Sequence, residues 1–275
     1  MSDPDGRRLI VTHQRPHLDE VVAIWLLRQF DPAFAKAPLQ FIPYFGQPPA
    51  GDHVTTLGIG GGKYDEHKLR HLTSATRLVY DDLMHRGLIP NDTHEDKALE
   101  WLVEFADAED QAKGYGTNDH LRPFHVANIV RSHRDRTGSD EAAINFGGEL
   151  IDDVMIELNE RAKFLQEWDE RIEFDTPWGK GVAVHSDYGR SDTFAYSQGF
   201  VCRVNIHKTD IIASIKCEPT SNADLTEAYN KAIALEPSSW YLHQSHKMLI
   251  SNIQPETGRQ PTKLSLQQLI DLVKV

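Results

Sequence analysis

Hydrophobic residues recur with two different periods along the first 90 residues, and the two periods alternate. Runs with a period of two or with continuous apolar residues predict strands, and runs with a period near 3.6 predict helices. The expected elements are strands at about 8–12, 39–43 and 54–60 and helices at about 19–30 and 73–87. Thr73 or Ser74 can cap the second helix and Gly87 can end it. This alternation is typical of an α/β unit with a parallel sheet.

The pattern changes twice further along the chain. From about 94 to 173 it is almost purely helical. The helices expected there lie at 95–107 and 140–172 (one long helix or two in series), with a polar, glycine-containing stretch at 113–119 between them. Beyond 175, short β-branched and aromatic runs favour a smaller α+β unit. Its expected elements are strands at 181–185, 193–197, 199–206, 210–217, 239–243 and 247–251 and helices at 222–235 and 264–274. We therefore predict two domains, 1–175 and 176–275.

Composition narrows the class of protein. The chain has 275 residues, of which 40% are hydrophobic, and no apolar run approaches the roughly 20 residues of a membrane span. The first residues lack the apolar core of a signal peptide, and Cys202 and Cys217 are the only cysteines. We expect a soluble, cytoplasmic protein with reduced, buried thiols, although a disulfide between the two stays possible.

The formal net charge of −12 argues against a broad electrostatic grip on nucleic acid. It does not exclude a nuclease with a local basic channel, because bound divalent cations add positive charge of their own.

Three clusters of polar residues carry candidate chemistry. The first lies where the first strand meets the first helix and contains His13, His17 and Asp19. Open α/β sheets place their ligands at the carboxyl ends of strands. Neutral imidazole and carboxylate groups are ligands for Mn, Zn or Fe. This cluster therefore predicts a metal site.

The second cluster follows the strand expected at 54–60. Gly60, Gly61 and Gly62 leave backbone amides free for an anion, and Lys63 could meet a phosphate. Asp65 and His67 come directly after them, and the alternative is a glycine turn with solvent-exposed polar residues.

The third cluster is the acidic end of a predicted helix, 104–110, which includes Asp107. Acidic groups at a helix carboxyl end oppose the helix dipole, which suits a metal site, although a solvated acidic face is the common alternative.

The three clusters, in this order, resemble the motifs of the DHH phosphoesterase superfamily. His13-x-x-Pro16-His17-x-Asp19 resembles its first motif, Tyr64-Asp65-Glu66-His67 resembles the Asp-His-His motif, and 105–110 resembles a later motif that adds one aspartate. Within the superfamily the chain is most similar to the melanocyte-proliferating-gene family, which also has a segment like 240–248 near its carboxyl end.

The resemblance implies a catalytic domain that holds two metal ions, with manganese the first choice and magnesium or zinc as alternatives. His13 and His17 would hold one metal, Asp19 and His67 would belong to the second, and Asp107 would complete the site. The motif residues Asp65, Glu66 and His67 are assigned to catalysis, with Asp65 and His67 as metal ligands too.

Two positions depart from the family pattern. Gly58 stands where the family has a bridging aspartate, and Glu66 stands where it has a histidine. Asp65 could bridge instead, the site could hold one metal, or the site could be inactive.

The resemblance also implies a second domain that grips the substrate. His243 and Lys247 are its candidates for binding phosphate, beside Gly60, Gly61, Gly62 and Lys63 of the first domain. Ordinary hairpin polarity is the alternative for His243 and Lys247.

The leading functional hypothesis is a divalent-metal-dependent phosphoesterase that hydrolyses its substrate with a metal-activated water. The expected substrate is a phosphorylated small molecule or a nucleic-acid end, and in the second case the enzyme would be a nuclease. The alternatives are a catalytically impaired DHH-like binding or regulatory module and a metal-dependent hydrolase of other bonds. No membrane partner is expected, and a homodimer stays open.

Overall fold

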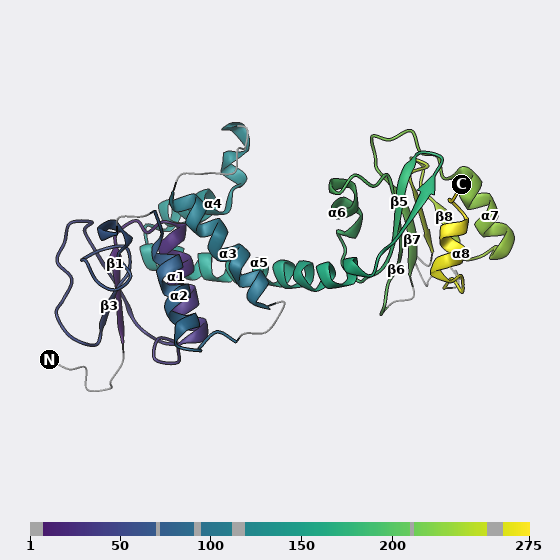
Figure 1. Cartoon of the computed structure of the whole chain (residues 1–275). Helices are drawn as coiled ribbons and strands as arrows, with labels where there is room; N and C mark the ends of the chain where they lie inside the picture. The colour runs from purple at the N-terminus through teal and green to yellow at the C-terminus, as the bar shows by residue number, and fades with distance from the viewer. Residues whose placement is uncertain (1–7, 70–71, 91–94, 112–118, 210–211, 252–260) are drawn as a thin grey trace. The chain divides into compact units, whose positions relative to one another are not determined.

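The computed structural model describes residues 8–69, 72–90, 95–111, 119–209, 212–251 and 261–275 (Figure 1). The chain divides into two compact units, Met1–Asn159 and Glu160–Val275. The first unit contains a three-stranded parallel sheet and the second a six-stranded mixed sheet. Among the described residues the chain is therefore a mixed α/β protein, which confirms the predicted class at this level.

The sheet of the first unit has the order β2-β1-β3, and its central strand is parallel to both neighbours. The strands are β1 (Leu9–His13), β2 (Leu39–Ile42) and β3 (Val54–Thr56). Because they are parallel, their carboxyl ends meet at one edge of the sheet. His13 lies at this edge and opposes Ile42 across the ladder. The third strand ends before the predicted 60 because Gly58 and Gly60 have φ angles of 65° and 73°, outside the β region.

Helices of this unit share one apolar core with Ile10 of the central strand. The helices from here to the end of α5 are α1 (Leu18–Phe30), η1 (Glu66–Lys68, 3₁₀), α2 (Ala75–His85), α3 (Glu95–Asp110), η2 (Asp119–Phe124, 3₁₀), α4 (Val126–Thr137) and α5 (Asp140–Asp169). The first helix is buried over most of its length because it packs against the sheet and against α2 and α3 (Figure 1). Ser74 caps α2 as predicted, since its hydroxyl accepts a hydrogen bond from the Arg77 N–H at 3.2 Å.

The sheet of the second unit has the order β4-β5-β6-β7-β9-β8. Its elements are β4 (Ile172–Thr176), β5 (Gly179–His185), α6 (Ser191–Ser197), β6 (Cys202–Ile206), β7 (Ala213–Cys217), α7 (Thr226–Leu235), β8 (Trp240–Leu242), β9 (Met248–Ser251) and α8 (Leu266–Asp271). Strands β5 and β6 are parallel, and the other paired strands are antiparallel. Apolar residues of α7 and α8 share one core with the sheet.

Two expectations about the second unit were wrong. Residues 193–197 form part of α6 instead of a strand, because Phe194 packs edge-on against Phe164 and Trp168 and this packing overrides local β propensity. The helix predicted to reach 172 ends at Asp169, and Ile172 begins the strand β4. In β4, Phe174 and Thr176 point inward while their neighbours are exposed. The apolar spacing of the preceding helix concealed this strand.

The division between the units falls within α5, at Asn159, whereas the sequence placed it near 175. The end of α5, from Glu160 to Asp169, groups with the second unit because Phe164 and Trp168 share a core cluster with Val182 and Val184 of β5. An apolar helical spacing does not reveal which core a helix end will join.

Two expectations about the chain's surroundings concern membranes and thiols. In the described part of the chain, every helix is either too short or too polar to cross a bilayer. Cys202 and Cys217 oppose one another on β6 and β7, and both are buried free thiols, as expected.

Candidate metal centre

The turn between β1 and α1 positions the first group of candidate ligands. His13 ends β1, and His17 is the residue that caps α1. Glu20, in the first turn of α1, accepts a hydrogen bond through Oε2 from the His17 backbone N–H at 2.7 Å. This bond satisfies a backbone donor at the helix start and fixes the Glu20 carboxylate.

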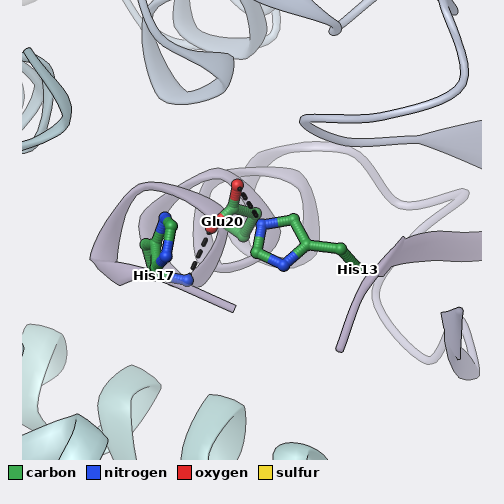
Figure 2. A group of neighbouring side chains, drawn as sticks. All are labelled: His13, His17 and Glu20. Carbon is green, nitrogen blue, oxygen red and sulfur yellow. Dashed lines mark hydrogen bonds and ion pairs between the residues drawn. The ribbon is translucent and has the colours of Figure 1, made fainter. Parts of the chain in front are cut away.

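His13, His17 and Glu20 converge from this turn, with one ligand atom of each lying within 4.8 Å of the others. The Glu20 Oε1 atom lies 3.1 Å from His13 Nε2, and the two imidazole rings are 5.2 Å apart. Figure 2 shows the Glu20 carboxylate linked on one side to the ring of His13 and on the other to the backbone of His17. His13 and Glu20 are both 3% exposed.

The hydrogen bonds of His13 leave a place for a proton or a cation between its Nε2 atom and Glu20. His13 Nδ1 lies 2.7 Å from the Gln14 carbonyl oxygen, which can only accept, so Nδ1 carries a hydrogen. Nε2 therefore has a lone pair facing the Glu20 carboxylate, unless a proton or a cation lies between them. Burial lowers the pKa of His13, but the hydrogen bond and charge of Glu20 outweigh it and raise that pKa. A metal-ligating histidine commonly donates its other N–H to a backbone carbonyl in this way.

A second group of candidate ligands consists of Asp19, Glu66 and Asp110, again with ligand atoms within 4.8 Å of one another. They come from α1, from η1 and from the last turn of α3. Asp19 is 2% exposed and accepts backbone hydrogen bonds from Ala75 (2.9 Å) and Thr76 (2.8 Å) at the start of α2. Three carboxyl groups distant in the sequence therefore share one site.

Burial and the charges of neighbouring carboxylates raise the pKa of every carboxyl in this second group. Burial is the largest cause for all three residues, and the charge of Glu20 is a further cause for each. Glu20 itself keeps a lowered pKa: burial opposes its ionisation, but the hydrogen bond and charge of His13 outweigh burial. A bound cation would relieve this repulsion.

Two buried carboxylate oxygens in this region have no hydrogen-bond partner among the described residues. They are Glu66 Oε2 and Asp107 Oδ1, and the Glu66 side chain is only 8% exposed. Buried polar atoms are nearly always satisfied in folded proteins, so these two oxygens fit a ligand that a chain alone does not contain. The donor set of imidazoles and carboxylates fits Mn²⁺ or Zn²⁺.

Asp65 organises the turn that carries Glu66 and His67. Its Oδ2 accepts a hydrogen bond from the Gly61 N–H at 2.6 Å, and its Oδ1 accepts one from the His67 N–H at 3.1 Å. His67 Nδ1 lies 3.1 Å from Asp65 Oδ1 and 2.9 Å from Glu66 Oε1. These contacts orient the His67 ring toward solvent, where its side chain is 52% exposed.

Tyr44 closes the group from the end of the neighbouring strand. Its hydroxyl lies 2.6 Å from His67 Nε2, and its ring is 5.3 Å from that of His13. Tyr44 follows β2, which ends opposite His13. The parallel register places both side chains at one edge, so a prediction of that register could have identified it.

The structure brings five of the six predicted metal ligands into these groups: His13, His17, Asp19, Asp65 and His67. The sixth, Asp107, lies close enough to Asp110 for its charge to raise the pKa of Asp110. It is Asp110, however, that joins Asp19 and Glu66. Sequence reasoning missed Glu20 and Asp110 as ligands, although each is three residues from a predicted one, which is about one helical turn.

The residues predicted to bind an anion are placed less favourably for that role. Lys63 pairs with Asp82, which also accepts a hydrogen bond from the Tyr64 hydroxyl at 2.6 Å. The Gly61 amide is bonded to Asp65, while Gly60 and Gly62 pack against Pro48 and Thr56 respectively. The glycine segment thus serves the turn and the position of Asp65.

His243 and Lys247 lie in the second unit, near β8 and β9. The Lys247 ammonium donates hydrogen bonds to the Ser221 and Ala223 carbonyl oxygens, so it anchors a loop. His243 is hydrogen-bonded to the Ser245 hydroxyl at 2.8 Å.

Comparison with known proteins leaves this geometry as the main guide to function. No protein-family model matches the chain, and a search of curated proteins finds no match either.

Proposed function

We propose that the chain is a divalent-metal-dependent phosphoesterase whose first unit is a DHH-like catalytic domain. The convergence of two histidines and four carboxylates, from β1, α1, η1 and α3, is the observation that carries this proposal. The unpartnered, buried Glu66 Oε2 supports it, because that oxygen needs a ligand. Manganese is the cation we propose, with magnesium and zinc as alternatives to test.

The ligand groups suggest separate places for two cations. His13 and His17 would hold one, and Asp19, Glu66 and Asp110 would hold the other. When bound, such cations supply an activated water and stabilise the charge that develops on the attacking and leaving oxygens.

His67 is the residue we propose for proton transfer. Asp65 and Glu66 contact its Nδ1 atom and hold the ring, while its Nε2 atom meets the Tyr44 hydroxyl. A half-exposed imidazole held in this way can move a proton between solvent and a substrate oxygen.

The substrate class we propose is a phosphorylated small molecule or a nucleic-acid end. An arginine in the turn that carries the first group of ligands supports an anionic substrate. Arg134 lowers the pKa of Asp135 through a hydrogen bond, and the charges of Arg15 and Arg131 add to this effect. Arg15 is exposed in the turn between His13 and His17. Arg15 thus adds a positive charge to the turn that carries two of the ligands, although the whole chain is acidic.

The proposal is tested with the full chain, stripped of metal and then titrated with Mn²⁺, Mg²⁺ or Zn²⁺. Hydrolysis of a chromogenic phosphodiester and of a short oligonucleotide is measured for wild type, His17→Ala and Asp110→Asn. Asp81→Asn is the matched control, because it removes one exposed carboxylate from α2 away from the ligand groups. We expect turnover only with added cation and a loss of about 100-fold or more in the two site variants. Turnover that survives metal removal would overturn the proposal.

A binding module without catalysis is the second candidate. Gly58 contributes no carboxylate, and the Lys63 ammonium is occupied by Asp82, so two groups that would serve catalysis are absent or engaged. Cation binding without turnover on any phosphoester, together with cation-dependent binding of a phosphorylated ligand, would favour this candidate.

A further inference from the structure

Gly58 and Glu20 compete for one position at the candidate metal centre. Gly58 follows β3 directly and has a φ of 65°, and its N–H donates to the Tyr64 carbonyl oxygen at 3.0 Å. A Cβ atom built on Gly58 would lie 2.6 Å from Glu20 Oε1 and 3.5 Å from its Cδ. A real Cβ is essentially never so close to another heavy atom, so a side chain at 58 and the observed Glu20 carboxylate exclude each other.

We propose that Glu20 is a metal ligand, and that it supplies from α1 the carboxylate that a side chain at position 58 could otherwise supply from the end of β3. This inference rests on the proposed function, because it requires the cation proposed at His13 and His17. It goes further by naming the carboxylate that completes this ligand set.

The two oxygens of Glu20 have different partners, and a cation would bind between Oε1 and the His13 ring. Oε2 is occupied by the His17 backbone N–H, and Oε1 points at His13 Nε2. The carboxylate is therefore anchored by Oε2 while Oε1 faces the His13 ring, and one Glu20 oxygen lies within 4.8 Å of a ring nitrogen of each histidine. Two histidines and one carboxylate form a common ligand set for Mn²⁺, Fe²⁺ or Zn²⁺.

The neighbourhood of this group contains an independent sign of a missing ligand. Glu66 Oε2 is buried and unpartnered among the described residues. Glu66 groups with Asp19, the residue before Glu20 in α1, and its charge contributes to the raised pKa of His13. Glu66 Oε1 pairs with His67 Nδ1 at 2.9 Å, so Oε2 is the unsatisfied oxygen, and it is consistent with a cation nearby.

The exchange between the two positions allows a rescue experiment. Asp tolerates a left-handed backbone better than most residues, so Gly58→Asp can place a carboxylate near the position of Glu20 Oε1 once Glu20 is shortened. Mn²⁺ binding is measured by calorimetric titration of the metal-stripped full chain. The proteins are wild type, Glu20→Ala, Gly58→Asp, Glu20→Ala/Gly58→Asp and, as a matched control without a carboxylate, Glu20→Ala/Gly58→Ala.

We expect Glu20→Ala to weaken Mn²⁺ binding by at least about tenfold, and Gly58→Asp to weaken it through collision with Glu20. The double variant Glu20→Ala/Gly58→Asp should recover most of the lost affinity, whereas Glu20→Ala/Gly58→Ala should not. Unchanged affinity in Glu20→Ala, or a Glu20→Ala/Gly58→Asp protein that binds no better than Glu20→Ala, would overturn the inference.

A second variant covers the case in which Glu20→Ala does not fold. Glu20→Gln keeps an oxygen for the His17 N–H and presents an amide donor to His13 Nε2, so the metal-free fold is preserved without an anionic ligand. We expect near wild-type thermal unfolding and at least about tenfold weaker Mn²⁺ binding. Mn²⁺ affinity of Glu20→Gln equal to that of wild type would overturn this inference, but it would not count against the proposed function. Absence of any cation binding by wild type would instead remove the proposed function itself.

Discussion

Asp19 and Thr76 form a reciprocal pair that joins α1 to α2. Asp19 Oδ1 accepts a hydrogen bond from the Thr76 backbone N–H at 2.8 Å, and the Thr76 hydroxyl donates to the Asp19 carbonyl oxygen at 2.7 Å. Both residues are buried, and they are 57 residues apart. The pair caps α2 and, at the same time, holds one carboxylate of the candidate metal centre in place.

Removing the Asp19 carboxylate should lower the free energy of unfolding. Asp19→Ala leaves the N–H groups of Ala75 and Thr76 without acceptors, and we expect a loss of about 2 kcal/mol in the metal-free protein. Asp19→Asn should cost less, because it keeps one acceptor and removes a charge that burial and Glu20 oppose. Urea unfolding of the three proteins measures both differences, and an Asp19→Ala protein as stable as wild type would show that this cap is unimportant.

Asp110→Asn should raise the stability of the metal-free protein and, at the same time, weaken its binding of metal. Burial and the charge of Glu20 raise the pKa of Asp110, so its ionised form disfavours the metal-free fold. A raised folded-state pKa means that the folded protein binds the proton more tightly than the unfolded chain, so wild-type stability increases as pH falls through that pKa. We therefore expect the metal-free variant to unfold at a higher temperature than wild type at pH 8, with the difference shrinking toward pH 5.

The same variant should gain less stability from Mn²⁺ than wild type does, because it lacks a ligand. Thermal unfolding with and without Mn²⁺ measures this effect, with Asp81→Asn as the control. A lower unfolding temperature of metal-free Asp110→Asn at pH 8 would contradict the repulsion we describe.

The second unit contains a buried charge, Arg203, and its pairing with Asp192 should make the free energy of unfolding depend on pH. Arg203 is 2% exposed, and its Nη2 lies 4.0 Å from Asp192 Oδ2, which also pairs with Lys216 at 2.8 Å. Burial opposes ionisation of Asp192, but the hydrogen bond of Lys216 and the charge of Arg203 outweigh it and lower the Asp192 pKa. This stabilisation is present above the unfolded-state value of about 4 and is lost as pH falls through the lowered folded-state pKa.

We expect Asp192→Asn to lower the free energy of unfolding by about 2 kcal/mol at pH 7, because it leaves the Arg203 guanidinium buried without its counter-charge. The difference from wild type should be smaller at pH 3 than at pH 7, because this stabilisation decreases as pH falls toward and through the lowered Asp192 pKa. Asp175→Asn, which breaks the exposed pair with Lys180, serves as the control and should change little. An equal effect of Asp192→Asn at both pH values would contradict the assignment.

Tyr44→Phe should affect turnover without affecting cation binding. The variant keeps the ring contact with His13 but removes the hydroxyl that meets His67 Nε2. If His67 transfers a proton, turnover should fall by roughly tenfold and its pH profile should shift. A parallel loss of Mn²⁺ affinity would instead make Tyr44 a part of the cation site.

The sequence predicted the parts of the site that local pattern determines. His13 and His17 were identified because a strand, a turn and a helix follow one another within a few residues, and Asp65 and His67 because a glycine turn follows a strand. Glu20 and Asp110 were missed because a helix presents several acids, and only the packing of helices decides which of them faces the sheet edge.

Tertiary packing also explains the larger differences. Residues 193–197 have strand-like composition but fold as α6 against the aromatic residues at the end of α5. The same kind of packing explains why the two units divide at Asn159 and not near 175, since Phe164 and Trp168 belong to a core of the second unit. Lys63 was expected at a phosphate, but Asp82, on a helix distant in the sequence, binds its ammonium.

An anomalous difference map of crystals soaked in Mn²⁺ tests the central claim most directly. We predict a peak within coordination distance of the His13 Nε2 atom, the His17 ring and the Glu20 carboxylate, and a second site beside Asp19, Glu66 and Asp110. A map from fully soaked crystals with no peak at either group would contradict the account.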